Sequence, residues 1–567
     1  MKFHTSDMVK FWIGLLLSNI LLVWAVLPLF GKGYFPMHDD TQVARVIAMG
    51  NALKELQIPV RIVDDLGYGY GYPIFNFYSP LPYYVGGLLY AIGVDAVVST
   101  KIMFLTPILL GASFLYLFLI PVYGIAASVV GSLLFSYAPY HAVQIYIRGS
   151  VGEYWAIAFV PLVLLSISNA HKYRGYVWTV IGSFSIAAML SSHTILSVLV
   201  ITLYVLFSIA YVFYQQVTRS PKNFRLYSPL LLILVGGLGL SAFFWIPAFL
   251  EMKYTGVSSM IASAPTSFYD HFVCTFQLWN SPWGFGGSAQ GCMSDGMSYK
   301  LGKIHIFFML VSMFLYIRKR YTDPKASTSF QFIIGIVLLF VSIFGTLELS
   351  SFIWNVFPFT SLVQYPWRLL SISIVASGIV GAYGISLVPN SRIRFLTALL
   401  SVVGIIAVNA KLFVPKYIYE PDVTHEFSTE DIRFRISKIS DEYLPDSLIK
   451  PKLSTEVPSK VLTSKFDARI TLQSQKSTYV KATVVTSSND ILTFQKAAFP
   501  GWVFTIDGKS VQSDTIHGLP VFSLSKGTHQ FEAVFKDTPI RSQSTIISVM
   551  TLLLLGGLLI YGQKTKA

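Results

Sequence analysis

The chain contains few charged residues and few cysteines. Asp, Glu, Lys and Arg make up only 12% of its 567 residues, about half the share typical of soluble globular proteins, which excludes an ordinary soluble protein. The two cysteines, Cys274 and Cys292, do not form a cysteine-type metal cluster. They lie in one segment and could form a disulfide if that segment is extracytoplasmic, a point that the sequence leaves open.

Several functional signatures are also absent. The glycine-rich segment 278–302 follows no strand and lacks the Gly-Lys-Ser/Thr sequence of a nucleotide-binding loop. We find no arrangement of Ser, His and Asp that indicates a hydrolase triad. No extramembrane segment has the clustered basic face of a nucleic-acid-binding protein. The net charge of +14 therefore indicates basic cytoplasmic loops and no nucleic-acid partner.

Long hydrophobic runs occupy most of the chain. Hydrophobic residues account for 53% of the sequence, and apolar runs long enough to cross a bilayer recur. The first run, 11–30, is too long for a signal-peptide core and precedes no cleavage site, so we interpret it as a retained span. The pattern predicts a polytopic α-helical membrane protein with about 12 to 13 transmembrane helices. The clear spans are 11–30, 101–120, 124–140, 152–168, 176–190, 194–214, 229–250, 304–317, 328–347, 367–388, 393–412 and 543–562.

Basic loops set the predicted orientation, because Lys and Arg are enriched on the cytoplasmic side of a membrane. Twelve spans alternate without conflict if the basic loops and both ends of the chain face the cytoplasm, and Ser220 is then cytoplasmic. The segment 79–93 is apolar but short, with two prolines and two adjacent glycines. We interpret it as an interfacial or re-entrant helix, since a span there would turn every later basic loop outward. The expected location is the cytoplasmic membrane. The basic segments are 171–176, 217–225, 318–325, 390–394 and the C-terminal QKTKA.

The C-terminal part is predicted to form a soluble domain outside the membrane. Residues 413–541 are rich in Ser, Thr, Lys and Asp and contain alternating apolar residues, a pattern that predicts strands. Asp507–Gly508 is a hairpin turn signal. We expect a small β-sandwich held by the last span. The predicted organisation is a transmembrane domain 1–412 with outer loops 31–100 and 251–303, the β-sandwich 413–541, and a C-terminal span with a cytoplasmic tail 542–567.

The first outer loop opens on His38, Asp39 and Asp40, followed by apolar residues at helical spacing. This pattern predicts an amphipathic helix on the outer membrane surface. Asp40 would suit the N-cap of that helix and its dipole. A helix needs only one cap, so two adjacent carboxylates and a His indicate a further use. A divalent cation bound through oxygen ligands and a general base acting on a hydroxyl are both open.

Four other polar residues are predicted near the same outer face. Arg148 and Glu153 lie at the edge of two spans, where charges tend to be paired or functional, and a mutual salt bridge is the alternative to a binding role. His193 lies in a turn between spans, where a structural role is the alternative. Arg368, beside Trp367, is either an interface anchor or a ligand for a lipid phosphate, whose oxygens a guanidinium can bind bidentately.

The order of these stretches resembles the GT-C superfamily of membrane glycosyltransferases. The resemblance is closer to the multispan membrane proteins with a 6-pyruvoyl-tetrahydropterin synthase-related domain and to the YfhO-type proteins, and we infer no pterin chemistry from the first label. The stretches that carry it are MHDDTQVARV, YGYPIFNFYSPLPYYVG, YIRGSVGEYWA, LSSHT, SPWGFGGS, DGMSYKLGKIH, FPFTSLVQYPWRLL and FPGWVFTIDGK.

The resemblance implies a GT-C-like enzyme that takes a sugar from a polyprenyl-phosphate carrier outside the cytoplasmic membrane and passes it to an envelope glycan, lipid or protein. On this sequence the role of catalytic base or metal ligand falls on Asp39, with Asp40 as its partner or second ligand. The candidate cofactor is a divalent cation, Mg²⁺ or Mn²⁺.

The resemblance also implies which residues contact the sugar donor and the acceptor. His38, Arg148, Glu153, His193 and Arg368 become the candidate contacts. Two rival functions remain, a transporter or flippase for a lipid-linked sugar and a non-enzymatic envelope scaffold.

Overall fold

The structure is a computed structural model that describes residues 5–170, 176–219, 228–257, 259–260, 267–323, 329–356, 363, 365–422 and 425–564. Ser220 and parts of three predicted cytoplasmic loops lie outside the described residues.

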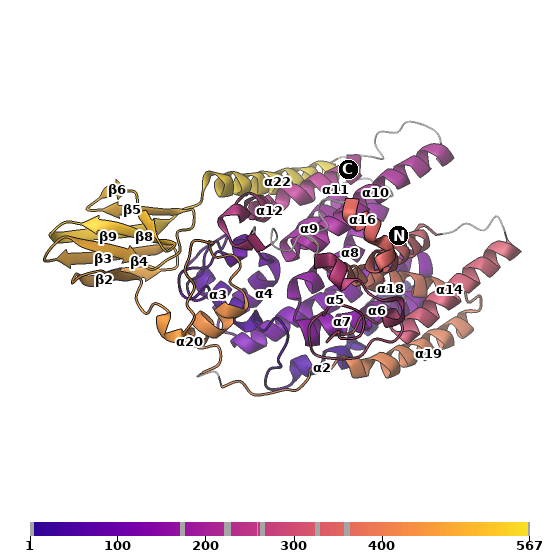
Figure 1. Ribbon diagram of the computed structural model, residues 1–567. Coiled ribbons are helices and arrows are strands. Elements are labelled where there is room, and N and C mark those ends of the chain that lie inside the picture. Colours follow the sequence, from indigo (N-terminus) through magenta and orange to yellow (C-terminus); the bar gives the residue numbers. More distant parts are fainter. Residues whose placement is uncertain are drawn as a thin grey trace.

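A bundle of apolar helices forms the larger part of the molecule (Figure 1). Each of the predicted spans coincides with one helix or with a bent pair of helices, because long apolar runs satisfy their backbone hydrogen bonds internally only as helices. The bundle helices are α1 (Thr5–Ile20), α2 (Val23–Phe30), α5 (Ala96–Tyr123), α6 (Ile125–Ser136), α8 (Val151–Ala170), α9 (Val177–Ser192), α10 (Thr194–Arg219), α11 (Ser228–Leu240), α12 (Ala242–Leu250), α14 (Lys303–Thr322), α15 (Phe330–Thr346), α18 (Leu370–Ser386), α19 (Ser391–Asn409) and α22 (Pro539–Lys564).

The helical class is confirmed, while the number of spans stays a prediction. Among the described residues, five helices are long and apolar enough to cross a membrane, or seven if each bent pair is one span. The pair α1 and α2 bends by 54°, and the pair α11 and α12 bends by 67°. Other bundle helices, such as α6 with 12 residues, are shorter than the length of about 20 residues that a straight span needs.

Two helices of the first outer loop, α3 (Gln42–Lys54) and α4 (Pro80–Ala91), pack closely against each other. Their contact needs small residues, because a Cβ atom at Gly87 would overlap Met49 and one at Gly50 would meet Gly87 O. The helix predicted after Asp40 is present, but nine of the 13 residues of α3 are buried, so it is covered by protein rather than lying free on the membrane surface. The 12-residue helix α4 is about 18 Å long, too short to cross the hydrocarbon core.

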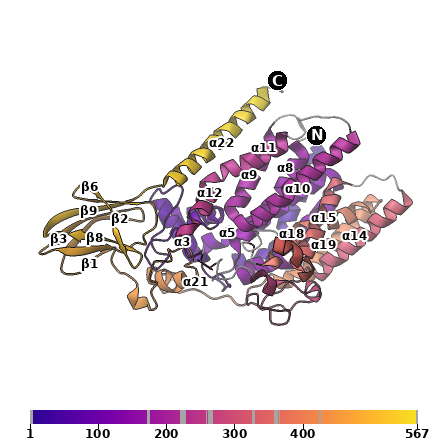
Figure 2. The ribbon, with the colours of Figure 1, turned by 45° about the horizontal axis from the view of Figure 1, so that its top comes forward.

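A sandwich of two antiparallel sheets forms the C-terminal domain, as predicted (Figure 2). Apolar residues from both sheets, including Val480, Phe494, Phe504 and Phe531, form one core between them. Asp507 and Gly508 connect β5 to β6 with positive φ angles of 53° and 75°, as the hairpin signal predicts. One sheet has the order β1 (Leu462–Ser464), β4 (Asp490–Phe494), β8 (Leu519–Leu524), β7 (Asp514–Ile516); the other has the order β2 (Arg469–Lys476), β3 (Tyr479–Thr486), β9 (Gly527–Phe535), β5 (Trp502–Ile506), β6 (Lys509–Val511).

The described residues of 413–461, which we call the linker segment, lie outside both sheets. They contain the short helices α20 (Thr429–Asp431) and α21 (Ser437–Ile439). Except for Val461, which packs in the sandwich core, their most buried apolar side chains belong to the core of the helical part. Tyr419 forms a β-bridge with Tyr34. The linker segment therefore covers the first outer loop.

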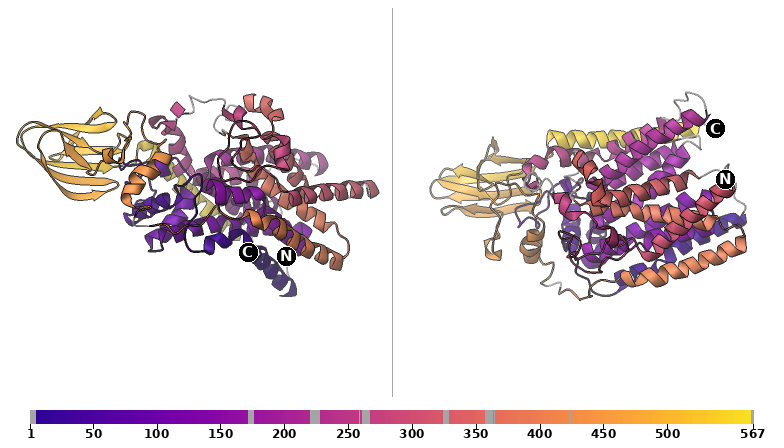
Figure 3. Two further views of the ribbon diagram at one scale, coloured as in Figure 1. Left: turned by 60° about the horizontal axis from the view of Figure 1, so that its bottom comes forward. Right: turned by 45° about the vertical axis from the view of Figure 1, so that its right-hand side comes forward.

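A buried ionic network joins the sandwich to the bundle at the start of α22. Arg541, with 0% of its surface exposed, donates to Glu251 Oε2 at 2.8 Å and to Pro500 O at 3.0 Å. Glu251 also accepts from Asn76 at 3.0 Å and from Thr538 at 2.7 Å. The first residues of α1 and the last residues of α22 lie at the end of the bundle away from the sandwich (Figure 3, right).

Candidate active site

The main chain of the acidic motif is held against the turn that precedes α8. The His38 N–H donates to Ile147 O at 2.8 Å, and the Asp39 N–H donates to Arg148 O at 3.0 Å. Gly149 completes this turn with a φ of +68°, and a Cβ atom there would overlap Met37, so glycine suits the close approach. These bonds bring Asp39 and Arg148, which lie 109 residues apart (148 minus 39), to the same place.

Asp39 presents a carboxylate that is both ionised and accessible. Its side chain is 45% exposed and accepts from His38 Nδ1 at 3.0 Å. Burial raises the pKa of Asp39, but the His38 hydrogen bond and the positive charges of Arg148, His38 and Arg45 outweigh it, so the pKa lies below its usual value. The same hydrogen bond raises the pKa of His38. Asp39 therefore has the charge and the access that a proton acceptor needs.

Asp40 faces a different set of neighbours in the linker segment. Burial raises its pKa to about 6, the nearby Glu426 and Asp431 raise it as well, and Arg435 opposes them. One carboxylate oxygen, Oδ1, has no hydrogen-bond partner among the described residues. The N-cap position of α3 is occupied by Thr41 without a side-chain cap, so the expectation that Asp40 caps the helix is wrong.

Arg148 and Glu153 form the salt bridge that was one of the two expectations for them. Arg148 Nη1 lies 2.9 Å from Glu153 Oε2, and their side chains are 11% and 0% exposed. The other oxygen of Glu153 accepts from Tyr140 and Gln144 at 3.1 Å and from Ser371 at 2.5 Å. Because Glu153 is fully enclosed, its geometry suits orienting Arg148 more than touching a substrate.

Arg148 also packs on an aromatic surface that leads to Arg368. The Arg148 guanidinium lies 4.4 Å from the centre of the Trp367 ring. Arg368, in the short helix η8 (Pro366–Leu369), donates to Val363 O at 2.7 Å. No carboxylate of the described residues lies within ion-pairing distance of Arg368, and its Nε is buried without a partner there. Its charge is thus available to an anionic ligand.

His193 lies close enough to Arg148, Glu153 and Arg368 for their charges to act on its ring. The Leu196 N–H donates to its Nδ1 at 3.0 Å, which caps the start of α10. Burial, followed by the positive charge of Arg368, lowers the pKa of His193 to about 3. The ring is therefore neutral at pH 7 with its proton on Nε2. Arg148, Glu153, His193 and Arg368, expected from three separate stretches, are brought together by the fold.

The sequence reasoning missed several residues beside Asp39. Arg45 on α3 is only 4% exposed, and its guanidinium lies 4.4 Å from the centre of the Tyr78 ring and hydrogen-bonds to Tyr83 and Ser440. The available signal was an arginine within an otherwise apolar helical pattern.

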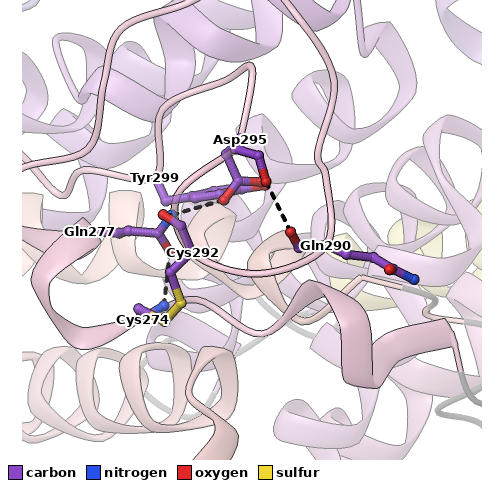
Figure 4. Close-up of a disulfide and its surroundings, with 7 residues drawn as sticks. Cys274, Gln277, Gln290, Cys292, Asp295 and Tyr299 are labelled. Carbon is purple, nitrogen blue, oxygen red and sulfur yellow. Dashed lines mark hydrogen bonds between the residues drawn. A yellow bond between two sulfur atoms is a disulfide. The ribbon is translucent and has the colours of Figure 1, made fainter.

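A disulfide-linked loop borders the site. Cys274 and Cys292 are joined, and Gln277, Asp295 and Tyr299 hydrogen-bond around the bridge (Figure 4). From this loop Gly287 approaches the acidic motif so closely that a Cβ atom there would lie 3.0 Å from His38 Nε2. The loop thus forms one wall of the site.

A shared metal site for Asp39 and Asp40 is not preformed. The described residues contain no group of three or more His, Cys, Asp or Glu side chains that could hold a metal ion, and the charged groups that shift the pKa of Asp39 differ from those that act on Asp40. A cation here would need further ligands, such as water molecules or oxygen atoms of a substrate.

Comparison with solved structures finds weak likenesses to two transferases. Arabinofuranosyltransferase AftD from Mycobacteria is 11% identical with a TM-score of 0.40, and the match covers 72% of this chain and 27% of that protein. The oligosaccharyltransferase of Archaeoglobus fulgidus is 13% identical with a TM-score of 0.42, covering 80% of this chain and 61% of that one. The chain therefore spans about a quarter and three fifths of their lengths.

The family is established by sequence. None of the curated proteins matches the chain. The model of the 6-pyruvoyl-tetrahydropterin synthase related domain, described as a membrane protein, matches residues 75–414, which is more than half of the chain. The chain belongs to this family of membrane proteins.

Proposed function

We propose that the protein is a membrane glycosyltransferase. It transfers a sugar from a polyprenyl-phosphate donor to a glycan, lipid or protein acceptor outside the cytoplasmic membrane. The observation that carries this proposal is the ionised, half-exposed carboxylate of Asp39 beside Arg148, whose guanidinium lies near the same Trp367 ring as that of Arg368. A base next to fixed positive charge is what displacement of a phosphate by a hydroxyl requires.

The proposed reaction is a single displacement. Asp39 accepts the proton of the acceptor hydroxyl while the hydroxyl oxygen bonds to the anomeric carbon of the sugar. The bond between that carbon and the phosphate oxygen breaks, and its electron pair leaves with the polyprenyl phosphate. Arg148 and Arg368 stabilise the charge of the departing phosphate. The configuration at the anomeric carbon is inverted.

An apolar groove supports a lipid-linked donor. It has a volume of about 340 Å³ and runs between α4, α9, the α11–α12 pair and α22. Pro80 and Ser191 line it, and their chain neighbours Ser79 and Ser192 pack so closely on Gly152 that no Cβ atom fits there. Since Gly152 precedes Glu153, these contacts connect the lining of the groove to the Arg148–Glu153 pair. A prenyl chain in the groove would hold its phosphate near Arg148.

A divalent cation remains a candidate cofactor, with Asp39 as its protein ligand. It would supply additional positive charge at the departing phosphate. The proposed displacement uses only residues of this chain.

The proposal is tested by mass spectrometry of envelope glycans in four strains. One strain lacks the gene, and the others carry the wild-type chain, Asp39→Asn or Asp514→Asn at matched membrane level. Asp514→Asn is the matched control because Asp514 lies exposed in β7 of the sandwich. We expect a sugar that is present with wild type and Asp514→Asn and absent from the other two strains.

A sugar restored fully by Asp39→Asn would refute the catalytic role. A lipid-linked sugar that only changes sides of the membrane, without covalent change, would favour a transporter. Because loss of a helix cap or surface hydrogen bond costs only about 1 kcal/mol, failure of Asp39→Asn to insert would indicate a structural role instead.

A further inference from the structure

A buried hydrogen-bonded chain connects the linker segment to the main chain of Asp39. Arg45 Nη2 donates to Ser440 Oγ at 2.8 Å, and Ser440 Oγ donates to Glu442 Oε1 at 3.1 Å. On its other side, Arg45 Nη1 donates to Tyr83 OH at 3.3 Å, and that hydroxyl donates to Gln42 Oε1. The chain therefore begins at an acidic residue of the linker segment and reaches the first turn of α3.

Gln42 ends the chain by bonding two carbonyls at once. Its Nε2 donates to Asp39 O at 3.2 Å and to Gly149 O at 2.8 Å. The first carbonyl belongs to the proposed base, and the second follows the cation Arg148. Both amide hydrogens and the amide oxygen of Gln42 are thus used, and its orientation is determined by the hydroxyl hydrogen of Tyr83.

The side chains that form this hydrogen-bonded chain are almost fully buried. Gln42 and Tyr83 are 0% exposed and Arg45 is 4% exposed. No carboxylate of the described residues pairs directly with Arg45, whose guanidinium rests on the ring of Tyr78. A buried guanidinium is costly unless its hydrogen bonds are satisfied, and an apolar residue would fill a helix interface at lower cost. Packing alone therefore does not account for an arginine here.

We propose that Arg45 is a positioning residue through which the linker segment sets the distance between Asp39 and Arg148. The assignment rests on the proposed function, because it matters only if these two residues act on one substrate. Small displacements of a base relative to a cation reduce the rate of a displacement reaction strongly. The linker segment, which continues into the sandwich, is then part of the support of the active site.

The experiment compares the amide hydrogen exchange of four full-length variants with that of the wild-type protein, all in detergent. Tyr83→Phe interrupts the hydrogen-bonded chain at its centre while keeping the aromatic ring, and Ser440→Ala removes the hydroxyl that accepts from Arg45. Ser440→Thr retains the hydroxyl, and Ser447→Ala changes an exposed serine of the same segment. The peptides measured cover residues 36–45 and 146–153, whose main chains bond to each other.

We expect exchange in both peptides to become about five- to tenfold faster in Tyr83→Phe and Ser440→Ala, as for the loss of one buried hydrogen bond. Ser440→Thr and Ser447→Ala should match the wild type, and the strands of the sandwich should exchange equally in all five proteins. Unchanged exchange in Tyr83→Phe and Ser440→Ala would overturn the proposal, and so would faster exchange in Ser440→Thr.

The same variants are then assayed for the sugar defined by the glycan comparison. We expect about tenfold less product with Ser440→Ala and recovery with Ser440→Thr. Faster exchange without any wild-type product would refute the proposed transfer reaction and leave the coupling in place. Wild-type product that Ser440→Ala does not reduce would refute the positioning role.

Discussion

Removal of the negative charge of Glu153 should destabilise the protein more than any surface change. Glu153→Gln leaves the Arg148 guanidinium, 11% exposed, beside Arg368 with no other carboxylate of the described residues within ion-pairing distance. Two unit charges about 4 Å apart interact by about 4 kcal/mol at an effective dielectric constant of about 20. Loss of one partner of a buried pair costs about 3 to 5 kcal/mol. The two figures agree, so we expect a loss of about 4 kcal/mol in the free energy of unfolding.

The assay is a double-mutant cycle in mixed micelles. The free energy of unfolding is taken from denaturant midpoints of wild type, Glu153→Gln, Arg148→Met and the double variant. The double variant should recover most of the loss, because neither charge is then left alone. If the effects of the two single changes simply add, or if Glu153→Gln is as stable as wild type, the reasoning that Glu153 neutralises Arg148 is refuted.

Three further predictions concern the acidic motif, the loop beside it and the orientation. Asp40→Asn should stabilise the protein at pH 8 by about 2 to 3 kcal/mol. The pKa of Asp40 in the folded state is near 6, above its unfolded value. The free energy of unfolding of the wild type therefore falls as pH rises from about 4 to about 6, by about 1.4 kcal/mol per pKa unit, and Asn removes this loss. Equal midpoints for Asp40→Asn and wild type at pH 8 in thermal unfolding would contradict this. Gly287→Ala should reduce the sugar product several-fold at unchanged membrane level, because its Cβ meets His38, whereas Gly556→Ala, which has open space, should not; equal products would argue against the loop as a wall. Ser391→Cys, at the exposed start of α19, should resist an impermeant thiol reagent in intact, unreduced cells, and labelling there would overturn the orientation.

Local patterns were sufficient for the elements of this fold. Runs of apolar residues predicted the bundle helices because a helix satisfies its hydrogen bonds within one segment. The alternation of apolar and polar residues and the Asp507–Gly508 turn predicted the strands of the sandwich, because successive side chains of a strand point to opposite faces of its sheet. The linker segment was assigned to the sandwich region in the predicted division at 413, since its composition is polar. Its packing against the first outer loop depends on contacts with residues nearly 400 positions earlier, which no local pattern reports.

For the candidate site too, the sequence identified single residues, whereas the fold determined their contacts. Charged residues at the ends of apolar runs identified Asp39, Arg148, Glu153, His193 and Arg368 one at a time, because a charge near hydrocarbon is costly and so conspicuous in the sequence. The sequence left a mutual salt bridge and a binding role as alternatives for Arg148 and Glu153, and the salt bridge became evident only from the distance between them.

The sequence by itself determined that this protein is a helical membrane protein with a β-sandwich, and which of its polar residues stand out. The tertiary structure alone decided which of them meet. It turned Asp39 and Asp40 toward different partners, enclosed Glu153 beneath Arg148, and connected Ser440 to the main chain of Asp39 through Arg45. The physical reason is range: periodicity and hydrophobicity act over a few residues, whereas charge pairing and buried hydrogen bonds join residues that are neighbours only after folding.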